Sequence, residues 1–119
     1  MTAPMFISSE AAQAVLRWPD AIEAVRAAYA QPATEHGLPR RTVARANGSW
    51  LRSLPAVPSA GRAFGAKLMG MSTTAATPGV EYVIVLFDRE TSRIAAFVDG
   101  AQVTAWRTAA TSAAALHRL

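Results

Sequence analysis

An almost unbroken apolar run at Val80–Phe87, with the sequence VEYVIVLF, constrains the fold more than any other feature of the chain. After Glu81 the run shows no alternation, whereas a strand with one face in water would alternate apolar and polar residues. We therefore expect a central strand that is covered on both faces. The cover comes either from helices of the same chain or from a further domain or second chain packed on the sheet.

Four other stretches also have the composition and the turn boundaries of strands. They are Arg41–Asn47, Trp50–Val57, Arg62–Met71 and Ile94–Val98. The dipeptide Asn47-Gly48 is a strong hairpin signal, and short connections between strands favour antiparallel pairing. The sequence therefore predicts a mainly antiparallel sheet of about five to six strands.

Two helices are expected before the sheet. Ser8 or Ser9 is a suitable N-cap, and alanine, valine and leucine follow at helical spacing. Pro19 ends this pattern and suits the first turn of a second helix, which Pro32 closes. With a third helix at the C-terminal end, the predicted fold class is α+β.

The C-terminal helix carries a local conflict. Thr104 is the expected N-cap, which places Arg107 in the first helical turn. A cation is unfavourable there because the helix dipole is positive at this end, unless an anion binds both the arginine and the free backbone N–H groups. The alternative is an arginine that is simply solvated on an alanine-rich helix.

Composition excludes several classes of protein. With no cysteine and only His36 and His117, the chain lacks the usual ligands of a zinc site, and neither histidine has a plausible nucleophile partner. The net charge of +4 comes from dispersed arginines, so we expect no nucleic-acid partner. No apolar stretch approaches the roughly 18 residues of a spanning helix and no signal peptide is evident, so we expect no membrane association and a cytoplasmic location.

Several motifs together resemble the ornithine cyclodeaminase and mu-crystallin family. The longest is an Asp-Gly pair followed by Thr-Ala-x-Arg-Thr-Ala-Ala-x-Ser-Ala, and three shorter motifs precede it in family order. The matching segments are Ala21–Tyr29 for the second helix, Pro39–Val43 for an arginine motif, Gly65–Leu68 for a lysine motif, and Asp99–Ala113 for the long motif. The resemblance covers essentially the whole chain.

The resemblance implies a substrate-binding and dimerisation domain. In the family a Rossmann domain that binds NAD or NADP follows, and the sequence ends at Leu119, where its glycine-rich fingerprint would begin. We therefore expect residues 1–119 to be a single, truncated domain without the Rossmann domain, which binds no cofactor alone. We also expect a homo-oligomer formed through the sheet.

The resemblance also assigns site residues. Arg41, Lys67 and Arg107 fall on the positions that bind the substrate carboxylate, which suits the fork of arginine and the point charge of lysine. Thr108 and Thr111 are weaker candidates for contact near the nicotinamide. No catalytic residue is expected in this chain, because the acid–base aspartate of the family lies in the missing domain. The alternative interpretation of Lys67, which does not use the resemblance, is a surface lysine whose stem is covered and whose amine lies in solvent.

Some details depart from the family pattern. Arg40 is adjacent to Arg41, and a shift of one residue along the strand would exchange their faces. The loop at 72–77 lacks the usual asparagine, and residues 78–81 replace a Thr-His-Gln-like segment. The identity of the substrate therefore does not carry over from the family.

Two functions remain open. The first is the substrate-binding part of an NAD(P)-dependent enzyme that acts on an amino or imino acid and is inactive alone. Family activities are ornithine cyclodeamination, ketimine reduction and alanine dehydrogenation, in which hydride passes between nicotinamide and the substrate α-carbon. The alternative is a non-catalytic module for oligomerisation or for binding a small carboxylate. Whether this chain is an enzyme by itself is left open.

Overall fold

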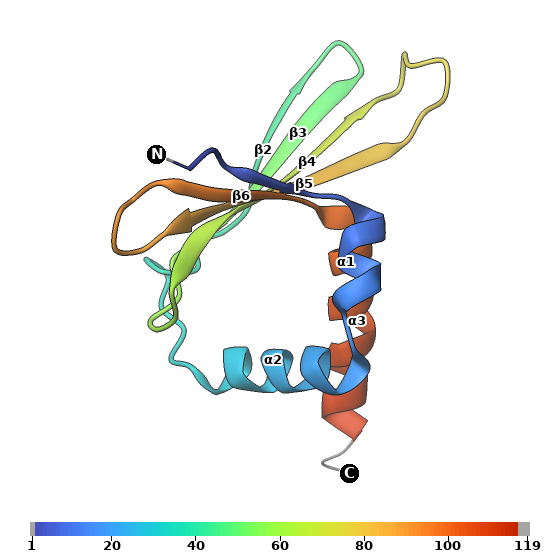
Figure 1. Cartoon of the computed structure of the whole chain (residues 1–119). Coiled ribbons are helices and arrows are strands. Elements are labelled where there is room, and N and C mark those ends of the chain that lie inside the picture. Colours follow the sequence, from blue (N-terminus) through green and yellow to red (C-terminus); the bar gives the residue numbers. More distant parts are fainter. Residues whose placement is uncertain (1, 117–119) are drawn as a thin grey trace.

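Six strands form one sheet in the order β1-β6-β5-β4-β3-β2, and three helices lie to one side of it (Figure 1). The computed structural model describes residues 2–116. In chain order the elements are β1 (Met5–Ile7), α1 (Ser9–Val15), α2 (Trp18–Ala30), β2 (Thr42–Ala46), β3 (Ser49–Ala56), β4 (Ala63–Ser72), β5 (Val80–Asp88), β6 (Ile94–Asp99) and α3 (Gly100–Leu116). The predicted α+β class and strand number are confirmed.

Strands β2 to β6 form the expected antiparallel meander, and the apolar run becomes β5, between β4 and β6. Strand β1 is not predicted from the sequence. It pairs parallel with β6, with Phe6 beside Phe97, and so makes the sheet mixed. Three residues are too few to show the period-two pattern by which a strand is recognised.

One face of the sheet is turned toward the helices, and the small core lies there. Ala96 and Val98 of β6 are buried on this side. The first residue of α3, Gly100, lies so close to β5 that an added Cβ would meet Tyr82 at 2.9 Å and Ile84 at 3.6 Å. Since Tyr82 and Ile84 alternate with Val83 and Val85, the two sets point to opposite faces of the sheet.

The opposite face is covered by no helix among the described residues. Phe6 is 67% exposed and Leu51 is 51% exposed. Strand register places six large apolar residues there, which we call the free face: Phe6, Leu51, Leu68, Val83, Val85 and Phe97. No residue of β5 is fully buried. The interpretation that helices of the same chain cover both faces is therefore wrong, and the interpretation that a partner covers the second face stays a prediction.

Helix α3 begins five residues earlier than the sequence predicts. The Asp99 carboxylate accepts a hydrogen bond from the Ala101 backbone N–H at 3.1 Å, so Asp99 is the cap and Thr104 is not. Arg107 is consequently the eighth residue of the helix, beyond the first turn. The predicted conflict with the helix dipole is therefore wrong, because this effect is confined to the terminal turn.

The helices pack through small and aromatic residues. The rings of Trp18 in α2 and Trp106 in α3 stack with centroids 4.0 Å apart, and Ala110 of α3 has no exposed surface. At the start of α1, the Ser8 hydroxyl accepts a hydrogen bond from the Ala11 N–H at 3.1 Å, which confirms Ser8 as the cap.

Within residues 2–116, no helix has the length and apolar character needed to span a membrane. The same residues include no group of three or more histidine, aspartate or glutamate side chains placed to hold a metal ion. His117 lies outside the described residues.

Candidate functional site

Lys67 lies in the middle of β4 and is half-buried. It pairs with Leu54 of β3 on one side and with Ile84 of β5 on the other. Paired residues of antiparallel strands share a face, and Ile84 faces the start of α3. Lys67 therefore projects from the same side of the sheet as the helices, and its Nζ lies 5.7 Å from the centre of the Tyr82 ring.

Three arginines lie near enough to this lysine for their charges to act on it. Burial lowers the pKa of Lys67, and the positive charges of Arg107, Arg41 and Arg52 lower it further, in that order. No carboxylate contributes in the opposite direction. The structure thus brings together Arg41, Lys67 and Arg107, the three residues that the sequence predicts, and adds Arg52. We call these four residues the cation cluster.

The sheet register explains why Arg41, and not Arg40, belongs to the cluster. Thr42 pairs with Ser53, so Arg41 stands level with Leu54, the residue that also faces Lys67. Arg40 lies outside β2 and, unlike Arg41, is not among the charges that lower the pKa of Lys67. The alternative register is therefore not adopted.

Arg107 reaches the site from a different layer, because it lies on α3 and not on the sheet. Its side chain is exposed. Among the described residues, the one ion pair within 4.0 Å joins Arg17 and Asp20. Both lie at the start of α2 and outside the cluster. The four positive charges are thus gathered without a protein carboxylate to balance them.

Arg52 is the residue that sequence reasoning misses. In β3 the positions Trp50, Arg52 and Leu54 are half-buried, and they alternate with the exposed Leu51. The guanidinium of Arg52 lies 5.1 Å from the centre of the Trp50 ring. The sequence does carry a signal for Arg52, because it is a charged residue at a strand position between the apolar Trp50 and Leu54 on the same face.

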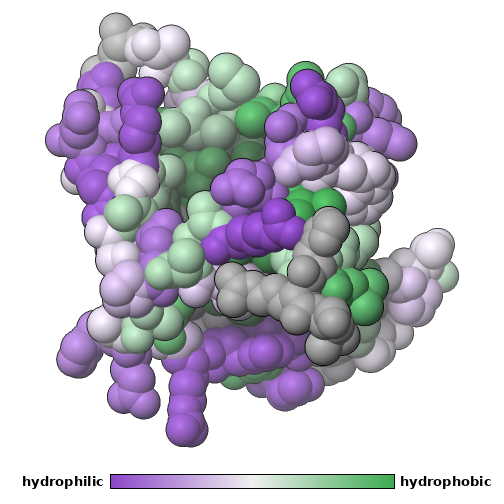
Figure 2. All heavy atoms as spheres, turned by 90° about the horizontal axis from the view of Figure 1, so that it is seen from below, coloured by the Kyte–Doolittle hydropathy of each residue, from purple (hydrophilic) through white to green (hydrophobic). Residues whose placement is uncertain are grey.

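Two hollows meet beside the cluster, and Leu54 and Ala56 line both of them. One, of about 260 Å³, is bordered by Lys67 and otherwise by apolar side chains. The other, of about 630 Å³, is bordered by Arg40 and Arg41. Seen from the helical side, apolar residues occupy a recess between hydrophilic borders (Figure 2). A separate hollow of about 430 Å³ near the end of α2 has no cation in its lining.

The threonines expected near a nicotinamide use their hydroxyl protons within α3. Thr108 donates to the Thr104 carbonyl and Thr111 donates to the Arg107 carbonyl, each at 2.8 Å. Strand β6 leads into α3 with the single glycine Gly100, and not with the G-x-G-x-x-G turn that cradles a pyrophosphate. The expectation that this chain binds no cofactor alone stays a prediction.

The fold is similar to several solved enzymes. A probable ornithine cyclodeaminase from Bordetella pertussis Tohama I matches with a TM-score of 0.78 and 26% identity over 92% of this chain and 34% of its own. An archaeal alanine dehydrogenase dimer with bound NAD matches with a TM-score of 0.72 and 20% identity over 91% and 35%. The Δ1-pyrroline-2-carboxylate reductase of Thermococcus litoralis, in complex with NADH and L-proline, matches with a TM-score of 0.72 and 23% identity. The match covers 91% of this chain and 35% of the reductase chain.

The chain spans about a third of the length of these solved structures. A search of curated protein sequences finds no match. The model of the ornithine cyclodeaminase/mu-crystallin family matches residues 3–119, which is nearly the entire sequence. The chain therefore belongs to the ornithine cyclodeaminase/mu-crystallin family.

Proposed function

We propose that the cation cluster binds the carboxylate of an amino-acid or imino-acid substrate, and that this chain is the substrate-binding part of an NAD(P)-dependent enzyme. The observation that carries the proposal is the unbalanced charge around Lys67, next to an apolar hollow. A carboxylate placed among these cations removes their mutual repulsion. The hollow accommodates the hydrocarbon part of the same molecule.

The residues of the cluster have different roles in this proposal. Arg41 and Arg107 each offer a planar fork that can hold both oxygens of a carboxylate, and Lys67 supplies a compact charge between them. Held from the strand side and from the α3 side, the carboxylate fixes the direction of the α-carbon. Such positioning lowers the entropic part of a reaction barrier without any proton transfer by these residues.

The reaction class follows from the family and stays part of the proposal. Ornithine cyclodeamination, ketimine reduction and alanine dehydrogenation all act at the α-carbon of a substrate held by its carboxylate. Thr108 and Thr111 remain predictions for contacts near the nicotinamide. We expect no turnover from these 119 residues alone, and NAD(P)-dependent activity of the isolated chain would contradict this. The cytoplasmic location also stays a prediction.

A second copy of the chain is the proposed partner of the free face. Its six large apolar residues form one surface on the sheet, and burial of such a surface is a strong drive for association. One similar structure is a dimer. The same surface supports the alternative function, a non-catalytic oligomerisation module, which binding measurements separate from the first.

The test is carboxylate binding by the chain and its Arg107→Ala variant, measured by titration calorimetry with L-proline. Loss of one charge-assisted contact costs about 1.5–3 kcal/mol, so we expect affinity to fall by about tenfold or more. Arg93→Ala is the matched control, because Arg93 is an exposed arginine outside the cluster. Equal affinity of wild type and Arg107→Ala would contradict the proposed site, and no carboxylate binding at all would favour the oligomerisation module.

A further inference from the structure

We propose that Arg52 determines specificity by binding a second negatively charged group on the substrate, so that the site takes a dicarboxylic amino or imino acid. This inference rests on the proposed function, since it concerns the same site. It goes beyond that function by naming the chemical class of the substrate side chain.

The position of Arg52 is suited to a second contact. Arg52 pairs with Met69 on β4, and Met69 is two residues from Lys67, so Arg52 and Lys67 are diagonal neighbours on one face. Diagonal neighbours in antiparallel sheets are about 7–8 Å apart at the backbone, within reach of long side chains. Arg52 is therefore offset along the sheet from a carboxylate bound at Lys67, and can bind a second group of the same ligand.

The guanidinium of Arg52 is held in place while part of its bonding capacity is unused. It lies over the Trp50 ring at 5.1 Å, and its Nε is buried without a hydrogen-bond partner. A buried donor without a partner is costly, and hydrogen bonds from a guanidinium to a carboxylate are among the strongest in proteins. An anionic group on the ligand would pair with the terminal nitrogens of the same guanidinium.

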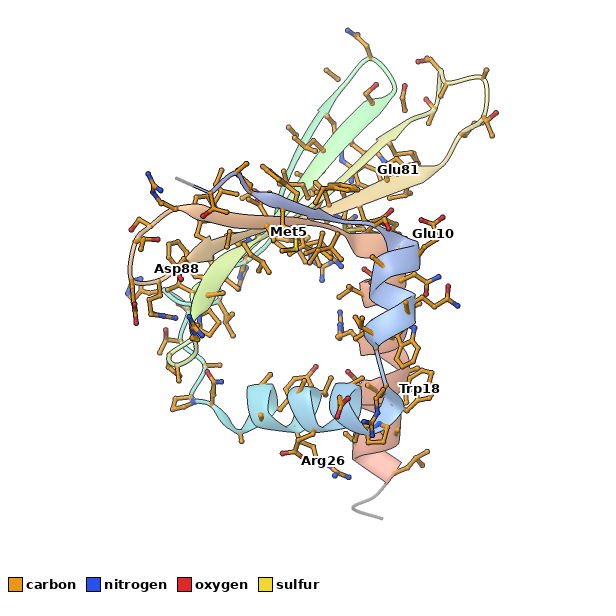
Figure 3. The ribbon with its side chains drawn as sticks, viewed as in Figure 1. Met5, Glu10, Trp18, Arg26, Glu81 and Asp88 are labelled. Carbon is orange, nitrogen blue, oxygen red and sulfur yellow. The ribbon has the colours of Figure 1, made fainter. Side chains whose placement is uncertain are left out.

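The charge count of the site favours the same ligand. A single carboxylate offsets one of the four positive charges, and a second carboxylate offsets another. Among the described residues no carboxylate acts on Lys67, and Glu81 and Asp99 border a hollow on the free face with Phe6 and Leu51. Figure 3 shows Glu81 on the part of β5 beyond the helices and Glu10 pointing outward from α1. A substrate with a distal ammonium would meet only repulsion.

Three linear four-carbon acids test the inference, because they differ only at the far end of the chain. Succinate ends in a carboxylate, butyrate in a methyl group and 4-aminobutyrate in an ammonium. For the wild-type chain we expect succinate to bind about tenfold or more tightly than butyrate, and 4-aminobutyrate to bind most weakly. The measurement is titration calorimetry at one pH and at low salt, where charge effects are largest.

Variants assign the preference to Arg52. We expect Arg52→Gln to bring succinate affinity down to within about twofold of butyrate affinity, and Arg52→Lys to retain part of the preference. Arg93→Gln is the matched control, because Arg93 is an exposed arginine outside the cluster. Equal binding of succinate and butyrate by the wild type would overturn the inference while leaving the proposed function intact. Failure of every carboxylate to bind would overturn both.

Discussion

Replacing Gly65 with valine is expected to unfold the chain or to lower its free energy of unfolding by about 3 kcal/mol or more. A Cβ at this position would collide with the backbone carbonyl of Val85 in β5, and a backbone obstacle does not move aside as a side chain does. Overpacking of a core by ordinary side-chain contacts already costs about 1–3 kcal/mol. A domain has only about 5–15 kcal/mol in total, so this loss is a large fraction.

Urea denaturation followed by circular dichroism measures the effect. Gly79→Val is the control, because an added Cβ at Gly79 meets no atom within 4 Å. Gly65 also lines the hollow beside Lys67, so any folded fraction of Gly65→Val should bind carboxylates more weakly. Equal stability of the two valine variants would show that β4 and β5 do not approach as closely as described.

Replacing Leu68 with glutamate is expected to convert a dimer into a monomer. Leu68 pairs with Val83 on the free face and borders a hollow of about 380 Å³ that Phe6 and Leu51 also line. Burying an unpaired carboxylate in an apolar interface costs several kcal/mol. We expect this cost to be large enough to separate the two copies. Light scattering should give twice 12.6 kDa for the wild type and 12.6 kDa for the variant.

The matched control for this substitution is Ala27→Glu, which adds the same charge at an exposed position of α2 away from the sheet. This variant should keep the mass of the wild type. A wild-type chain that stays monomeric at high concentration, or a Leu68→Glu variant that stays dimeric, would contradict the proposed use of the free face.

Much of the fold is predictable from the sequence because its signals are local. The apolar run at Val80–Phe87 and the Asn47-Gly48 turn identify the central strand and a hairpin without knowledge of the rest of the chain. The cap of α3 is not predictable in this way, since Asp99 and Thr104 have similar intrinsic preference for the position. The end of β6 decides between them by bringing Asp99 to the helix start.

The candidate site is predictable in part, for a comparable reason. The resemblance to the family identifies Arg41, Lys67 and Arg107, which fall within its motifs. Arg52 falls outside those motifs, and its importance comes from the register that sets it diagonally across from Lys67. Pairing between β3 and β4 is a non-local property, so only the folded sheet shows that Arg52 and Lys67 share the face that Arg107 approaches from α3.

The proposed carboxylate site gives the half-buried Lys67 a partner of opposite charge on the helical side of the sheet. In the free protein, burial and the charges of three arginines lower the pKa of Lys67. A bound carboxylate reverses this balance, because a nearby negative charge favours the protonated amine. Carboxylate affinity should therefore fall as pH rises through the pKa of Lys67, and that fall should begin below the pH at which an ordinary lysine titrates.

The most direct test is an NMR titration of the Lys67 amine with and without succinate. Lys67 is the only lysine in the chain, so isotope-labelled lysine gives a single side-chain signal. We predict a pKa below the ordinary lysine value in the free chain, and a higher pKa when succinate is bound. A pKa that is the same in both titrations would contradict the assignment of the cation cluster as a carboxylate site.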